Sequence, residues 1–134
     1  MKRLARYLVL FVALLLFGCE QLREEYYGLF LSAVVVDQSG TPIQGICAYP
    51  EGGEFQGREG YSDHLGRISA FTQLKPRSRW IISFADVDGE YNGGVFKSMD
   101  IDVTSKVTPP SLPDDNGYTG SCLVNLDTVV MSRL

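Results

Sequence analysis

Hydrophobic residues form one unbroken run near the start of the chain, and behind it they recur in short blocks separated by polar turns. The run covers residues 7–17 and follows the basic residues Lys2, Arg3 and Arg6. In a helix, these eleven residues would reach about 16 Å, about half of a ~30 Å hydrocarbon core. A basic start followed by about 7–15 apolar residues is typical of a secretory signal. We therefore expect an export signal here rather than a transmembrane span.

The blocks behind this run have the β-branched and alternating character of strands. They are separated by segments rich in glycine, proline, asparagine and aspartate, which favour turns. We predict strands over residues 29–37, 43–49, 80–86, 95–103 and 122–134, and two short extended pieces on either side of a turn at 61–67. About seven short strands with turns every ~8–12 residues indicate an all-β sandwich.

Alternation within the strands assigns side chains to the core. If Gly45 marks a bulge, the strand around it leaves Cys47 pointing outward. The predicted inward sets are Ile43, Ile46 and Ala48; Ile68, Ala70 and Thr72; Trp80, Ile82 and Phe84; Val95, Lys97, Met99, Ile101 and Val103; and Cys122, Val124, Leu126 and Val130.

Three polar, glycine- or proline-rich loops are candidates for binding. They cover residues 51–60, 86–94 and 105–121, and the last is long enough to suggest a functional or disordered segment. Phe55, Tyr91 and Tyr118 are candidate contacts for a protein or glycan partner. We expect a binding function to be favoured if the three loops gather at one end of the sandwich.

The apolar run ends in Leu16-Phe17-Gly18-Cys19, which resembles a bacterial lipobox. The resemblance implies cleavage after Gly18 and lipid attachment to Cys19, with the protein anchored at the outer membrane of the cell envelope. Two or more acyl chains hold a protein firmly at a membrane. We therefore expect a signal peptide over 1–18, a lipidated tether over 19–28 and one domain over 29–134. The alternative is an ordinary secretory signal followed by an unrelated cysteine.

The net charge of residues 19–134 limits the classes of partner that the domain is expected to bind. Lys2, Arg3 and Arg6 are the charged residues before Cys19, so residues 19–134 keep nine basic and all sixteen acidic residues, a formal charge of −7. An acidic domain does not favour nucleic acid or anionic membrane surfaces. The partners that remain are the membrane, reached through the lipid, and an envelope protein or a glycan.

Oxygen ligands near residue 90 raise the question of calcium. Asp86, Asp88 and Asn92 lie within seven residues and Asp100 follows on the next strand, so the four could bind Ca²⁺. An alternative function is therefore a calcium-stabilised adhesion or glycan-binding domain. The EF-hand spacing is absent, and Asp-Gly and Asn-Gly-Gly sequences are also typical of hairpin turns. The turn is the favoured interpretation, and no other cofactor is indicated.

The cysteines leave one question open. With Cys19 lipidated, Cys47 and Cys122 remain, and an exported compartment permits a disulfide between them. Strand phase opposes the bond because it turns Cys47 outward and Cys122 inward. The alternative is two free thiols that behave as small hydrophobic groups.

The sequence carries no recognisable catalytic motif. It has one histidine, His64, at a predicted turn, and it lacks Gly-x-Ser-x-Gly, Cys-x-x-Cys and a phosphate-binding glycine loop. We therefore expect a protein that is not an enzyme.

Two stretches carry a family resemblance. Val35-Val36-Asp37 with Pro42-Ile43-Gln44-Gly45, followed by Ser62-Asp63-His64-Leu65-Gly66, resembles the opening of a carboxypeptidase regulatory-like domain, which implies a prealbumin-like (transthyretin-like) Greek-key β-sandwich of about seven strands. With residues 82–96 and the lipobox, the chain resembles the radical SAM-associated lipoproteins. That resemblance implies no catalytic residues, and it suggests that the chain is a substrate or accessory protein of a radical SAM enzyme as an alternative to a binding module.

Overall fold

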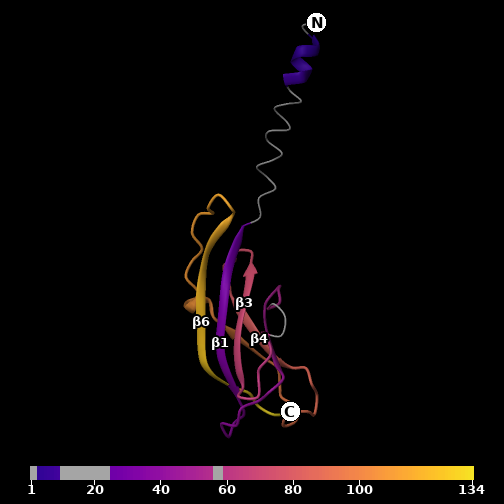
Figure 1. Cartoon of the computed structure of the whole chain (residues 1–134), viewed down its shortest axis with the longest axis vertical. Coiled ribbons are helices and arrows are strands. Elements are labelled where there is room, and N and C mark those ends of the chain that lie inside the picture. Colours follow the sequence, from indigo (N-terminus) through magenta and orange to yellow (C-terminus); the bar gives the residue numbers. More distant parts are fainter. Residues whose placement is uncertain (1–2, 10–24, 56–58) are drawn as a thin grey trace.

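The computed structural model describes residues 3–9, 25–55 and 59–134 and has mostly β structure (Figure 1). A short helix covers residues 3–9. The strands and the one 3-10 helix of the domain are β1 Tyr26–Val36, β2 Ile46–Pro50, β3 Arg67–Leu74, β4 Ile81–Asp86, β5 Met99–Asp102, η1 Thr104–Lys106 and β6 Tyr118–Val130. Within the described residues, no helix combines the length and the apolar character that crossing a membrane requires.

The strands form two three-stranded sheets, ordered β3-β1-β6 and β2-β4-β5. The central strand β1 pairs antiparallel with β3 and parallel with β6, and these three strands lie side by side in Figure 1. In the other sheet β4 pairs antiparallel with both neighbours. The prediction of an all-β, sandwich-like fold is confirmed.

The core lies between the sheets and follows the alternation of the strands. Every second residue of β1 from Tyr27 to Val35 is at most 3% exposed, as are Ile82 and Phe84 of β4. The rings of Tyr27 and Trp80 meet with centroids 5.2 Å apart. Because burying one such side chain contributes about 1.5–3 kcal/mol, the inward faces of β1 and β4 supply much of the stability of the fold.

The predicted inward faces of β2, β3 and β4 are correct. Ile43, Ile46 and Ala48 are buried, as are the inward residues of β3 and β4. Gly45 has φ +83°, and Cys47 is partly exposed. The turn at Gly45 therefore sets the phase of β2, as expected of a glycine that interrupts a strand.

Residues 95–103 do not form the single strand that the alternation predicted. Strand β5 covers only Met99–Asp102, and Phe96 is 4% exposed while Lys97 is exposed. Phe96 instead forms a bridge with Arg133, and Lys97 N–H donates to the Ser132 carbonyl. Pairing with the C-terminal residues thus turns Phe96 into the core, opposite to the predicted phase.

The last strand also changes phase within its length. Its register against β1 shifts between the Ser32–Asn125 and Val34–Thr128 pairs, and Asp127 has φ +53°. As a result Val124 is buried as predicted, but Val130 is 51% exposed and Val129 is buried in its place. A β-bulge inserts one residue and reverses the face of everything after it, which alternation alone cannot anticipate.

Two predicted boundaries were wrong. Strand β1 begins at Tyr26, so the last three residues of the predicted 19–28 tether belong to the sheet, and Tyr27 is 1% exposed. At the other boundary, β6 begins at Tyr118 and η1 covers Thr104–Lys106, so the predicted loop at 105–121 keeps only residues 107–117. Tyr26 N–H donates to the Gly117 carbonyl, which joins the two corrected boundaries at one end of the domain.

Three turns share one hydrogen-bonded design. In each, an aspartate accepts backbone N–H bonds from residues two and four ahead, and a glycine with positive φ stands three residues ahead. The turns begin at Asp37, Asp63 and Asp114. They satisfy the polar backbone where the chain reverses, and His64 is exposed in the second of them.

Candidate functional site

The predicted calcium ligands divide into a compact turn and one distant side chain. The Asp86 carboxylate accepts from Asp88 N–H at 3.2 Å and from Phe96 N–H at 3.0 Å, while Asn92 Nδ2 donates to the Asp88 carboxylate at 2.6 Å. Burial is the main cause that raises the pKa of Asp86, followed by a hydrogen bond with the Asp88 side chain. Within this turn, the carboxylate oxygens of Asp86 and Asp88 already accept hydrogen bonds from backbone N–H groups and from the Asn92 side chain.

Asp100 lies on β5, opposite Ser83, whose hydroxyl donates to it at 2.6 Å. Ser83 and Asp86 are three positions apart on β4 and therefore point to opposite faces of the sheet. The structure thus brings together Asp86, Asp88 and Asn92 but not Asp100. Within residues 3–9, 25–55 and 59–134, no three His, Cys, Asp or Glu side chains are grouped so that they could hold a metal ion.

The two described cysteines are free and belong to different sheets. Cys122 lies on β6 opposite the inward Leu29, which agrees with its predicted phase, and its thiol donates to the Lys106 carbonyl at 3.3 Å. The structure thus has two free thiols at the positions for which the sequence left a disulfide open. Burial and the neighbouring Cys122 raise the pKa of Tyr27 to about 12, and the Tyr27 hydroxyl donates to the Thr108 carbonyl.

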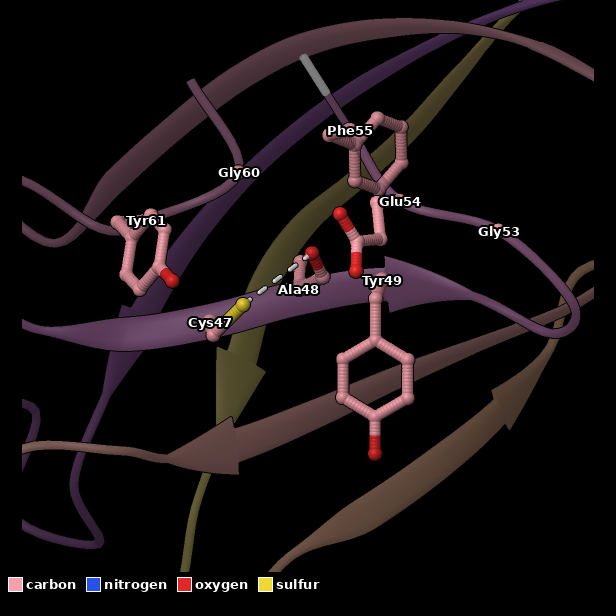
Figure 2. A pocket seen from close by; sticks show the side chains of 8 residues that line it. All are labelled: Cys47, Ala48, Tyr49, Gly53, Glu54, Phe55, Gly60 and Tyr61. Carbon is pink, nitrogen blue, oxygen red and sulfur yellow. Dashed lines mark hydrogen bonds between the residues drawn. The ribbon is translucent and has the colours of Figure 1, made fainter. Parts of the chain in front are cut away.

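Cys47 lines a small pocket between β2 and the segment that returns beside it (Figure 2). The pocket has a volume of about 290 Å³, and Cys47 forms an isolated bridge with Tyr61 along one wall. Glu54 and Phe55 close the pocket on another side. Figure 2 shows the Tyr61 hydroxyl on the same side of β2 as the thiol and Tyr49 pointing away from both.

The electrostatics of this pocket disfavour a thiolate. Burial raises the pKa of the Cys47 thiol, a hydrogen bond with Tyr61 lowers it, and the charge of Glu54 raises it again, with a net upward shift. The thiol donates to the Ala48 carbonyl at 3.7 Å. Because the thiolate is the reactive form of cysteine, Cys47 is poorly suited to nucleophilic chemistry at neutral pH.

The candidate contact aromatics have three different environments. Phe55 is 7% exposed and belongs to the core, so its prediction as a surface contact was wrong. Tyr91 is 79% exposed on the 86–94 loop. Tyr118 is partly exposed at the start of β6, and its hydroxyl lies 3.1 Å from where a Cβ on Gly28 would stand.

The predicted binding loops do not gather at one end. Residues 108–117 contact the start of β1 through the Tyr27–Thr108 and Tyr26–Gly117 hydrogen bonds. The 86–94 loop begins at Asp86, which pairs with Ile46 at the start of β2. The start of β2 lies near the end of β1, because Ile43 N–H donates to the Val35 carbonyl. The 108–117 and 86–94 loops therefore lie at opposite ends of β1, while Glu54 of the 51–60 loop accepts a hydrogen bond from Thr72, which pairs with Leu29 near the start of β1. This arrangement weakens a site built from all three loops.

A surface that the loop-based prediction missed lies on the outer face of sheet β3-β1-β6. Phe30 pairs in register with Phe71 on one side and Leu123 on the other, and the two rings meet with centroids 4.5 Å apart. Phe30 is 45% and Leu123 is 64% exposed. These three residues form what we call the outer-face patch, and with neighbouring serines they line a shallow hollow of about 430 Å³. The signal in the sequence was three apolar residues at outward positions of otherwise alternating strands.

Comparison with known proteins adds no assignment. No protein-family model matches the chain, and the comparison with curated proteins gives no significant match. Gly18 and Cys19 lie outside the described residues.

Proposed function

We propose that this chain is an exported lipoprotein, cleaved after Gly18 and lipidated on Cys19, whose β domain is held at the outer membrane as a non-catalytic binding or envelope-assembly module. The lipobox-like sequence supports the anchor, and the position of β1 supports its use. Only residues 20–25 separate Cys19 from Tyr26, where the sheet begins. Six residues reach at most ~20 Å, so the domain would stay close to the membrane surface.

The direction of β1 orients the domain in this proposal. Tyr26, next to the anchor, contacts Gly117, so the 107–117 loop is near the membrane. The end of β1, with Asp37 and the neighbouring 86–94 loop, points away from it. The outer faces of the two sheets run along the direction of β1, so they stay accessible from the side.

The chemistry of the described residues favours binding over catalysis. The pKa of Cys47 is raised, so its thiol is protonated at neutral pH. Asp37 and Asp63 are engaged in turns, with their carboxylates bonded to backbone N–H groups. The apolar outer-face patch, in contrast, has the character of an interaction surface.

The finer fold that we propose is the prealbumin-like, seven-strand Greek key. Residues 60–62 run beside β2, with Ala48 N–H donating to Gly60 and Ser62 N–H donating to Ile46, and so act as a short additional strand. Ser62 is buried, donates to the Ile43 carbonyl and accepts from Ile46 N–H. These contacts give a physical role to the Pro-Ile-x-Gly and Ser-Asp-x-x-Gly stretches that carry the resemblance. An experimental structure with another strand order would refute this finer proposal.

The test of the proposed function is the intact mass of the protein purified from native membranes, compared with a Cys19→Ser variant. We expect the mature chain to begin at Cys19 with added acyl mass, and the variant to lose both the acyl mass and the membrane fractionation. A protein that keeps residues 1–18 and fractionates with the water-soluble material would refute the proposal. A further unexplained mass on the described residues would favour the alternative of an enzyme-modified substrate.

A further inference from the structure

The outer face of sheet β3-β1-β6 is almost without charge. Among its outward positions only Arg67 is charged, and it forms an ion pair with Asp63 at 3.3 Å. Asp127 is exposed at the bulge of β6, and Glu59 is the one acidic residue that lines the hollow. The outward positions, assigned from the registers of β1 with its neighbours, are Tyr26, Gly28, Phe30, Ser32 and Val34 on β1; Arg67, Ser69, Phe71 and Gln73 on β3; and Ser121, Leu123, Asn125, Thr128 and Val130 on β6.

This face carries less charge than the chain as a whole. Charged residues make up 21% of the sequence, and residues 19–134 have a formal charge of −7. Two copies of such a protein repel each other least where they meet through an uncharged surface. Exposed apolar groups rimmed by polar ones, as in the outer-face patch, mark interaction sites.

We propose that the outer face of sheet β3-β1-β6 is the contact between two copies of this chain, packed sheet against sheet while both are anchored to the same membrane. The inference rests on the proposed lipid anchor for its orientation. Anchoring puts the Tyr26 end of β1 toward the membrane in both copies. The twofold axis that preserves this orientation runs parallel to β1, between the two sheets.

That symmetry makes the outer-face patch self-complementary. Rotation about an axis parallel to β1 places Phe30 opposite Phe30 of the second copy, and β3 opposite β6. Phe71 of each copy therefore faces Leu123 of the other, so the exposed apolar row is covered along its whole length. Two sheets packed face to face adopt such an aligned arrangement, with strand directions within about 30°.

The chemistry of the face favours a second copy over a glycan. Its exposed centre consists of phenylalanine and leucine, which offer no hydrogen bonds, and its polar groups are short hydroxyls and amides set at the sides. A sugar ring needs polar partners for its hydroxyls in addition to an apolar platform, and the side chains at the centre of the row, Phe30 and Leu123, provide none. A second apolar row of the same shape needs no such partners.

The size of the face predicts a weak contact that depends on the membrane. Three strands ~4.8 Å apart and about nine residues long give a surface of about 14 by 30 Å, or about 850 Å² for two copies. Stable interfaces bury about 1,200–2,000 Å². The free domain should therefore be a monomer, and confinement of both copies to one membrane, which raises their local concentration, should produce the dimer.

The test is thiol crosslinking of the full chain in native membranes. Ser32 lies outward on β1, two residues from Phe30, and would approach its own copy across the axis. A Ser32→Cys variant treated with a short bis-maleimide should give at least fivefold more crosslinked dimer than the unsubstituted chain, which reports the background from Cys47 and Cys122. A Ser78→Cys variant is the matched control, since Ser78 is exposed before β4 and lies outside this face.

Phe30→Thr or Leu123→Thr, each added to Ser32→Cys, should lower the yield to background at equal membrane levels and unchanged far-UV dichroism. Dilution in detergent should lower it at least fivefold. Equal yields from Ser32→Cys and Ser78→Cys, or adducts with another protein in place of the dimer, would overturn the proposal.

Failure of the anchor can be distinguished from failure of the packing. If fractionation shows the protein free of the membrane, the proposed function fails, and crosslinking is repeated on concentrated soluble protein. Selective dimer formation by Ser32→Cys would still support packing through this face, and its absence would overturn it.

Discussion

The two sheets have equivalent inner faces and different outer faces. On sheet β3-β1-β6 the outer face has an apolar row at its centre and little charge, whereas on sheet β2-β4-β5 it carries Asp100 and Asp102, the second paired with Arg79 at 3.5 Å. The strands differ too, since β1 has 11 residues and β5 has four. One core thus supports two surfaces with different chemistry, and the longer, nearly neutral one is the surface that we propose as a contact.

The largest effect should come from the shared core. Leu31→Ala on β1 and Ile82→Ala on β4, at 1% and 0% exposure, should each lower the free energy of unfolding by about 2–5 kcal/mol, because each leaves a cavity between the sheets. Leu123→Ala on the outer face should change it by only about 0.5 kcal/mol. Urea denaturation of the three variants measures the difference. An equally large loss for Leu123→Ala would mean that the outer face is part of the folded core.

A second pair compares glycines in a turn of each sheet. Gly66 has φ +74°, and an added Cβ would lie 2.3 Å from the Val35 carbonyl oxygen, while Gly89 has φ +66° and nothing within 4 Å. Gly89→Ala should cost about 1–2 kcal/mol from conformation alone. Gly66→Ala should cost about 1–3 kcal/mol more, because backbone must move. Equal losses in thermal unfolding would contradict the close approach of the turn to β1.

The contribution to stability should also depend differently on pH for the aspartates at the ends of β1 and β4. Hydrogen bonds from Ser39 and Thr41 lower the pKa of Asp37 at the end of β1, while burial raises the pKa of Asp86 at the end of β4. The Asp37 contribution to stability is therefore complete above the unfolded value of about 3.9 and is lost as pH falls through the lower folded pKa. Asp86 acts in the opposite sense, because the native state takes up its proton first as pH falls.

Replacing Asp37 by Asn should flatten the loss of stability at acid pH, and replacing Asp86 by Asn should steepen it. Chemical denaturation repeated from pH 7 to pH 3 gives both slopes. A change of the same sign in the two variants would show that the two carboxylates have similar environments.

The smallest effect concerns calcium. Adding Ca²⁺ to EDTA-treated protein should leave the melting temperature unchanged, because Asp86 and Asp88 are bonded within their own turn and Asp100 is bonded to Ser83. Magnesium at the same concentration is the control for ionic strength. A rise specific to calcium would show that the turn rearranges around an ion, since ligand binding to the native state stabilises it.

Sequence reasoning succeeded where periodicity was local. The faces of β2, β3 and β4 follow from alternation around Gly45, Ala70 and Ile82, because short strands keep one phase. It failed where distant residues decide, as in the pairing of Phe96 with Arg133 and the bulge at Asp127 that exposes Val130. The outer-face patch was missed for a related reason: Phe30, Phe71 and Leu123 are far apart in sequence, and only the strand register makes them neighbours.

The central position of β1 has a mechanical consequence. A pulling force applied at residue 25 and resisted at the far end of the domain acts lengthwise on a strand that is hydrogen-bonded on both sides, to β3 and to β6. Such a load is shared by many bonds at once, in shear, instead of opening them one after another from an edge. The fold should therefore resist tension along β1, whether its N-terminal end is held by a lipid anchor or by another molecule.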